Sequence, residues 1–218
     1  MNRRNFLRLA GGGVILAAGG TALFTATRTP HKALAPWGQA GTYSDPRMSA
    51  LSFAILAPNP HNRQPWIVSL EDKDALTLYF DTDKQLPHTD PLDRQLTIGL
   101  GCFLELMRMA AAANGYLVET TLFPEGSDTA GLDGRPIAHV RFKEADTMVG
   151  PLWAHVLDRR SNKEPFDTAR PIASTALQRI LGFARSATLG GTINAGDIAA
   201  WRKLTSDAMR IEVETPRT

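Results

Sequence analysis

The most regular pattern of apolar and polar residues lies between residues 90 and 115. Apolar side chains recur there every three or four residues, the spacing of one helix face, at Leu96, Leu100, Phe103, Leu104 and Met107. Asp90 and Pro91 form a typical helix start, and Asn114-Gly115 forms a typical end. The pattern predicts a long, central and largely buried helix that is capped by Asp90.

Shorter runs rich in β-branched and aromatic residues predict strands. They are residues 66–71, 76–82, 116–123 and 137–142. The first two runs are separated only by Asp72 to Asp74, which predicts a hairpin. Before this hairpin, Asp45 and Pro46 are typical of a helix start, as cap and first residue, and the helix should end before Pro58.

The chain after Glu144 shows a different pattern, because no further strand-like run follows. Its residues predict a short helix over 150–160 and longer helices over 173–187 and 195–214, the last starting near Asp197. The expected fold class is therefore α+β, with an antiparallel-dominated sheet flanked by helices.

The N-terminus has the features of an export signal. Arg3 and Arg4 precede Phe6 and Leu7, and a glycine-rich apolar run follows. This order favours a twin-arginine signal, read by the twin-arginine translocase, over an ordinary secretory signal with two chance arginines. We therefore expect an exported, periplasmic protein whose residues 1–35 are signal and linker. Because this route transports folded proteins, a cofactor would be loaded in the cytoplasm.

Cleavage of the signal is expected at Ala33 to Ala35, a small-residue pattern, although Pro36 should hinder the peptidase. The uncharged run before Thr27 is nearly long enough to span a bilayer, but its glycines make it a poor anchor. We expect release, with a minority of uncleaved, membrane-tethered chains. The stretch from Thr27 to Arg47 has no periodicity, which predicts an irregular linker.

Composition narrows the range of partners. The 24 basic and 22 acidic residues leave a net charge of +2 without a long basic run, which argues against nucleic acid. The single cysteine, Cys102, excludes an internal disulfide and a cysteine-rich zinc site. Its apolar surroundings predict a small buried hydrophobe and not a reactive thiol.

Two loops contain the candidate ligand-binding residues. The first, residues 58–66 (PNPHNRQPW), places Asn62 and Gln64 between prolines just before a strand. Amide side chains donate and accept hydrogen bonds, so they match the alternating carbonyl and N–H groups on the edge of a flavin or pyrimidine. His61 has no second ligand at metal-binding spacing, and no metal site is predicted.

The second loop, residues 158–166 (DRRSNKEPF), follows a predicted helix. Arg159, Arg160 and Lys163 supply positive charge and Ser161 a hydroxyl group, a combination that binds phosphate. The alternative is a solvated helix C-terminus, where basic residues are favoured electrostatically.

Together the two loops resemble segments of the flavin-dependent nitroreductase superfamily. Residues 58–66 are similar to its PSxxNxQPW segment. Residues 159–166 are similar to its RRSxRxF phosphate-binding segment, with one extra residue before Phe166. The order of the loops, with the twin-arginine signal, resembles the Acg-like branch, in which one chain has two nitroreductase-like halves.

The resemblance implies FMN as the cofactor. The family's flavin and phosphate ligands correspond to Asn59, Pro60, Asn62, Gln64, Arg159, Arg160, Ser161 and Lys163. Asn59 and Pro60 would face the polar edge of the flavin, where the family usually has small serines. Asn62 and Gln64 would organise the loop.

The resemblance also divides the chain into a first half (45–150) and a partial second half (151–218). Members of the family are longer, and their remaining strands complete the second half. We therefore expect a truncated second half. By the same resemblance, we expect a dimer or an internal pseudo-dimer.

The function implied is that of an FMN-dependent, nitroreductase-like oxidoreductase of the cell envelope. It would pass electrons from a small-molecule donor to a quinone or nitro-aromatic acceptor, and no catalytic side chain is identified. One alternative is a non-catalytic flavin-binding or flavin-sequestering protein, or a pseudoenzyme without FMN. A weaker alternative is a periplasmic binding module for an anionic metabolite.

Overall fold

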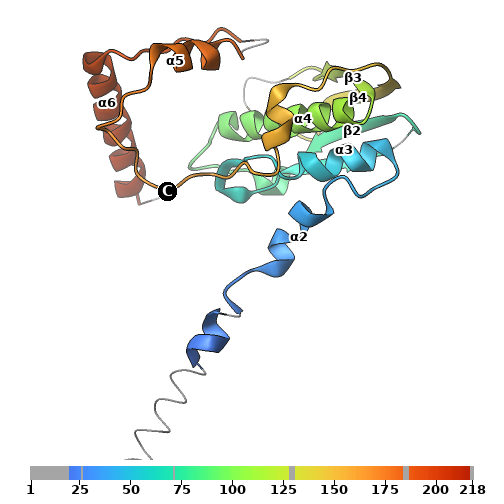
Figure 1. Ribbon diagram of the computed structural model, residues 1–218, viewed down its shortest axis with the longest axis horizontal. Helices are drawn as coiled ribbons and strands as arrows, with labels where there is room; N and C mark the ends of the chain where they lie inside the picture. Colours follow the sequence, from blue (N-terminus) through green and yellow to red (C-terminus); the bar gives the residue numbers. More distant parts are fainter. Residues whose placement is uncertain (1–19, 26, 71, 128–130, 184–186, 217–218) are drawn as a thin grey trace, which may run out of the picture.

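The computed structural model describes residues 20–25, 27–70, 72–127, 131–183 and 187–216. A four-stranded sheet and two packed helices, α3 and α4, form its centre (Figure 1). Two further helices, α5 and α6, lie to one side of this centre, and α2 leads away from it.

The sheet consists of β1 (Trp66–Ser69), β2 (Ala75–Phe80), β3 (Tyr116–Leu122) and β4 (Pro136–Glu144), in the order β1-β2-β4-β3. Every neighbouring pair is antiparallel. The predicted hairpin is β1 and β2, paired from Trp66 opposite Phe80. The prediction of an α+β fold with an antiparallel sheet flanked by helices is therefore confirmed.

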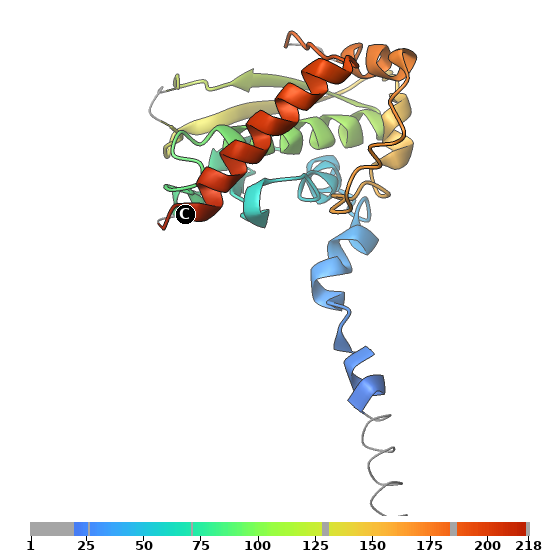
Figure 2. The same ribbon diagram turned by 90° about the vertical axis from the view of Figure 1, so that its left-hand side faces the viewer.

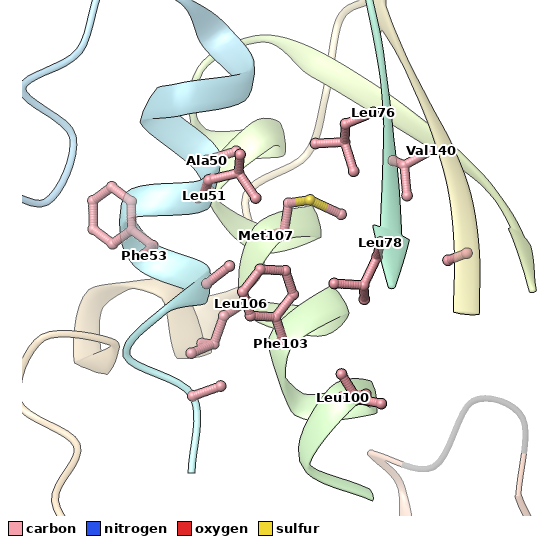
Figure 3. Packing of buried hydrophobic residues seen from close by; sticks show 14 of the residues in the cluster. Ala50, Leu51, Phe53, Leu76, Leu78, Leu100, Phe103, Leu106, Met107 and Val140 are labelled. Carbon is pink, nitrogen blue, oxygen red and sulfur yellow. The ribbon is translucent and has the colours of Figure 1, made fainter. Parts of the chain in front are cut away.

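Helix α4 (Arg94–Ala113) packs against α3 (Pro46–Ala54) and against the sheet. Figure 3 shows the apolar side chains that meet between these elements. Deeply buried examples come from α3, α4 and the sheet: Ala50, Leu76, Leu78, Leu96, Leu100, Phe103, Met107 and Val140. The ring of Trp66 packs on Phe103 with centroids 5.0 Å apart. The predicted central helix is therefore confirmed.

Helix α4 is also long and apolar enough to cross a membrane, which no other helix in the described part of the chain is. Half of that apolar window is buried inside the protein. Packing against the sheet and α3 accounts for its hydropathy.

The start of α3 is as predicted, whereas the start of α4 is not. Asp45 caps α3, since its carboxylate accepts the N–H of Arg47 at 2.8 Å. In α4 the first helical residue is Arg94, and the cap position is Asp93, in a left-handed conformation. The turn from Asp90 to Asp93 precedes the helix.

Asp90 nevertheless reaches the first turn of α4 from outside the helix. Its Oδ2 accepts the backbone N–H groups of Gln95 at 2.8 Å and Leu96 at 3.0 Å. The Asp90 carboxylate is buried and satisfies two donors that have no partner within the helix. Asp90 therefore caps α4, but over a distance of several residues.

After Glu144 the described residues contain no strand, as predicted. The run at 150–160 forms only a short 3-10 helix, η3 (Pro151–His155). Helix α5 spans Ser174–Leu181 and helix α6 spans Ala195–Glu214, and no side chain of either helix is buried. Helix α6 begins before Asp197, because Asn194 accepts the N–H groups of the first turn.

The expectation of an irregular linker between Thr27 and Arg47 is wrong in part. Residues His31–Gln39 form helix α2 with Pro36 inside it. The linker was predicted from the lack of periodicity, but Trp37 and Ala40 gain contacts with the rest of the protein that favour a helix. The small-residue pattern at Ala33 to Ala35 therefore lies in a helix, whereas the paired arginines lie outside the described residues.

Two substitutions in α4 test this account of the core. Leu100 is 1% exposed and Ile98 is 65% exposed. Leu100→Ala should lower the free energy of unfolding by about 2–5 kcal/mol, because it leaves a cavity. Ile98→Ala should change it by only about 0.5 kcal/mol. Urea denaturation measures both, and similar losses in the two variants would contradict the placement of α4.

Candidate functional site

The loop at residues 58–66 is rigid, for reasons that the sequence only partly shows. Its short helix η1 (Pro60–Asn62) includes left-handed backbone at His61 (φ 49°) and Asn62 (φ 52°), and Gln64 (φ 51°) is also left-handed. Such conformations cost energy in residues other than glycine, so surrounding contacts must hold them.

Asn59 supplies one of these contacts. Its Oδ1 accepts the backbone N–H of Gln64 at 2.8 Å, and its Nδ2 donates to the carbonyl of Ala57 at 3.2 Å. We predicted that Asn62 and Gln64 would organise the loop, but both are exposed and the Asn59 side chain does so. Asn59 can do this because its side chain bonds to Ala57, before the turn, and to Gln64, after it.

Arg63 supplies a second contact that the sequence analysis missed. Its Nε donates to the carbonyl of Lys84 at 3.0 Å, and its Nη2 donates to that of Asp83 at 2.9 Å. Both carbonyls belong to η2 (Thr82–Lys84), a short helix just after β2. An arginine within a proline-rich turn was the available signal, but its partner could not be identified without the fold.

A hollow of about 280 Å³ lies between this loop and α4. It is lined by Pro58, Asn59, Pro60, Gln95, Ile98, Gly99 and Cys102. Gly99 permits the close approach of loop and helix, since a Cβ there would lie 3.2 Å from Asn59 Cβ and 3.3 Å from Pro60 Cδ. The lining is mostly apolar with two amide groups, which suits a flat ligand with a polar edge.

Arg159 connects the second predicted loop to the segment just before the first loop. Its Nη2 donates to the carbonyl of Leu56 at 2.7 Å, two residues before the first loop. Its Nε is buried and has no hydrogen-bond partner. An unpaired buried donor of a charged group is costly unless a water molecule or a ligand satisfies it. The guanidinium is therefore suited to bind an anionic group.

Cys102 lines the hollow and is sensitive to the charge of Arg159. Burial raises the pKa of the Cys102 thiol, and the nearby Arg159 charge opposes part of that rise. The thiol is therefore protonated at neutral pH, in agreement with the predicted unreactive cysteine.

The other residues of the second loop do not converge on Arg159. Arg160 donates through Nη1 to the carbonyls of Leu157 at 2.6 Å and Arg159 at 2.7 Å. Ser161 and Lys163 are exposed. Of the predicted ligands, Asn59 and Pro60 line the hollow, and Arg159 lies outside its lining but bonds to Leu56, two residues before the first loop. Asn62, Gln64, Arg160, Ser161 and Lys163 also lie outside the lining.

Two larger hollows lie away from both predicted loops. One, of about 890 Å³, follows the exposed helix α6 and is lined by residues such as Gly191 and Trp201. Another, of about 390 Å³, lies over Thr77 and His139 on the sheet. Within the described ranges, no three His, Cys, Asp or Glu side chains are grouped to hold a metal ion. We therefore place the candidate site at the smaller hollow.

Gly99 and Gly101 form a matched pair for testing the contact between loop and helix. A Cβ at Gly101 would meet nothing within 4 Å, so Gly101→Ala should stabilise the helix by about 0.5–1 kcal/mol. Gly99→Ala should gain little or nothing, because its methyl group presses on Asn59 and Pro60. Thermal denaturation compares the two, and equal stabilisation would disprove the close packing.

Comparison with known proteins agrees with the resemblance of the two loops. No protein-family model matches the chain. Over 121 residues, 54% of the chain, it is 36% identical to a Mycobacterium tuberculosis protein named "Putative NAD(P)H nitroreductase acg". Over 84 residues, 38% of the chain, it is 33% identical to a second M. tuberculosis protein with a nitroreductase name of the same kind. These matches span 35% and 24% of the two relatives.

A solved structure of a nitroreductase family protein from Clostridium difficile 630 is also similar, at 18% identity. The match covers 67% of this chain and 88% of that one, with a TM-score of 0.36, which does not by itself establish a shared arrangement. The sequence matches support a relationship to nitroreductases, over about a third of the length of the relative named first.

Proposed function

We propose that this protein is an FMN-dependent oxidoreductase of the nitroreductase type that acts in the cell envelope. It would reduce quinone or nitro-aromatic acceptors with electrons from a small-molecule donor. The sequence relationship supports an oxidoreductase. The finer assignment to FMN depends on the geometry around Arg159.

The observation that supports FMN most directly is the hydrogen bond from Arg159 to the carbonyl of Leu56. It joins a guanidinium, whose buried Nε has no protein partner, to the chain two residues before the loop that forms the hollow with α4. A flavin mononucleotide needs both features, a slot for its ring and a cation for its phosphate. The residues present therefore fit this cofactor.

The roles of individual residues follow from their chemistry. Arg159 would bind the phosphate through a charge-assisted hydrogen bond. Pro60 and Ile98 present apolar surface to a ring, and the amides of Asn59 and Gln95 border the same hollow. When bound, FMN supplies hydride transfer, and the chain supplies position and partial exclusion of water. The hollow is near the lower end of typical ligand-pocket volumes, roughly 300–1,000 Å³.

Export by the twin-arginine route is part of the proposal. The paired Arg3 and Arg4 followed by Phe6 and Leu7 support it. Nicotinamide cofactors are scarce outside the cytoplasm, so the proposed electron donor is a small molecule and not specifically a nicotinamide.

A second candidate function is flavin sequestration without catalysis. It is favoured by one observation, that no residue lining the hollow is a carboxylate or a histidine able to act as a general acid or base. The Cys102 thiol, whose pKa is raised by burial, does not fill that role. The two functions differ in how fast the bound flavin is reoxidised.

Colour and reoxidation kinetics separate these functions. The purified protein, incubated with FMN and freed of excess, should be yellow and should bleach on reduction with dithionite. As an oxidoreductase, it should then reoxidise with a soluble quinone faster than free reduced FMN does. Slower reoxidation than free FMN would favour sequestration, and a protein that stays colourless would contradict both functions.

The phosphate assignment has a separate test. Arg159→Gln removes a charge-assisted hydrogen bond worth about 1.5–3 kcal/mol, so affinity for FMN should fall about tenfold or more. Riboflavin, which lacks the phosphate, should bind almost as before. Arg202→Gln, an exposed arginine on α6, is the control and should leave both affinities unchanged. Fluorescence titration measures the four values, and equal losses of FMN and riboflavin in Arg159→Gln would contradict the assignment.

A further inference from the structure

Arg160 has partners that are distinct from those of Arg159. Its guanidinium Cζ lies 5.0 Å from the ring centroid of Trp37, a cation–π contact with helix α2. Its Nη1 also donates to two carbonyls of its own turn, those of Leu157 and Arg159. In Figure 2 the upper end of α2 lies next to the orange loop that follows η3. The second arginine of the pair is thus engaged by the N-terminal segment.

That segment is attached to the folded centre at a defined point. The backbone N–H of Gly41 donates to Ser52 Oγ on α3 at 2.8 Å, and that buried hydroxyl donates to the carbonyl of Ser49 at 2.6 Å. Gly41 has a φ of +78°, and a Cβ there would lie 3.1 Å from the Phe53 ring. A glycine is therefore required for this approach. We call residues 36–41 the docking segment.

The docking segment faces the same group of rings as η3. Phe53, which Gly41 approaches, packs on Trp153 of η3 with centroids 4.8 Å apart. The indole Nε1 of Trp37 is buried without a hydrogen-bond partner, which shows that the ring points into the protein and not into solvent. The rings of Phe53 and Trp153 thus link the docking segment to η3, and Trp37 contacts the turn that follows it.

We propose that Trp37 is a positioning residue for the phosphate site. By stacking on Arg160 it fixes the turn after η3, and this turn holds Arg159 at the carbonyl of Leu56, just before the first loop. The proposal rests on the proposed function for the role of Arg159 and adds that the two neighbouring arginines act differently. Arg159 binds the anion, whereas Arg160 attaches the turn to the docking segment.

Backbone hydrogen exchange measures the positioning directly and needs no flavin. The amides of Asp158 and Arg159 both donate to the carbonyl of His155, so their exchange reports on the order of the turn. Trp37→Ala should speed exchange in residues 157–160 about fivefold, as expected for loss of a cation–π contact. Trp37→Phe, which keeps an aromatic face, should restore most of the protection.

Two further variants make the result specific. Arg160→Gln removes the cation from the same contact and should speed exchange to the extent that Trp37→Ala does. Trp201→Ala removes a 61% exposed ring on α6 and should have no effect on this turn. Exchange in Trp37→Ala that matches Trp201→Ala would overturn the proposal. If Trp37→Ala fails to fold, the comparison of Arg160→Gln with Trp201→Ala decides in the same way.

Flavin titration separates this proposal from the proposed function. Trp37→Ala should weaken FMN several-fold more than riboflavin, because the phosphate ligand loses its position. If Arg159→Gln weakens FMN selectively but Trp37→Ala does not, the positioning role is wrong and the proposed function stands. If the unaltered protein shows no preference for FMN over riboflavin, the phosphate assignment fails, and hydrogen exchange still decides whether Trp37 orders the turn.

Discussion

The arrangement of the candidate site depends on one hydrogen bond, from Arg159 Nη2 to the carbonyl of Leu56. The two residues are 103 positions apart in the chain, and this is the side-chain hydrogen bond by which the second loop is joined to the segment just before the first. A charge-assisted bond in a partly buried setting is worth about 1.5–3 kcal/mol. The bond holds a guanidinium at the start of the segment that leads from Leu56 into the first loop.

Helix α4 supports the loop at residues 58–66, which forms the other wall of the hollow. Its buried face holds the sheet and α3, so its opposite face has a fixed position against which the loop at 58–66 can be placed. Gly99 brings that loop to within van der Waals distance, and Asn59 and Arg63 hold its left-handed backbone from either side. Rigidity in this loop therefore comes from several weak contacts and not from its prolines alone.

Local features of the structure could be predicted from the sequence, and long-range ones could not. Asp45 with Pro46, and the short Asp72 to Asp74 connection, determine their own helix start and hairpin. Asp90 shows the limit, since its carboxylate caps α4 only after an intervening turn. Arg159 and Arg160 are neighbours with similar chemistry, and only the positions of Leu56 and Trp37 assign them different partners. Helix α2 was missed because contacts to the folded centre, and not its own composition, favour it.

The most direct test of the central claim uses the single cysteine as a probe of the hollow. Cys102 lines it and is the only thiol in the chain, so alkylation by N-ethylmaleimide reports on one position. If FMN binds in the hollow with its phosphate at Arg159, saturating FMN should slow alkylation about tenfold or more. The measurement is best made at alkaline pH, because burial raises the thiol pKa. An alkylation rate that saturating FMN leaves unchanged would show that the flavin binds elsewhere, and would contradict the site described.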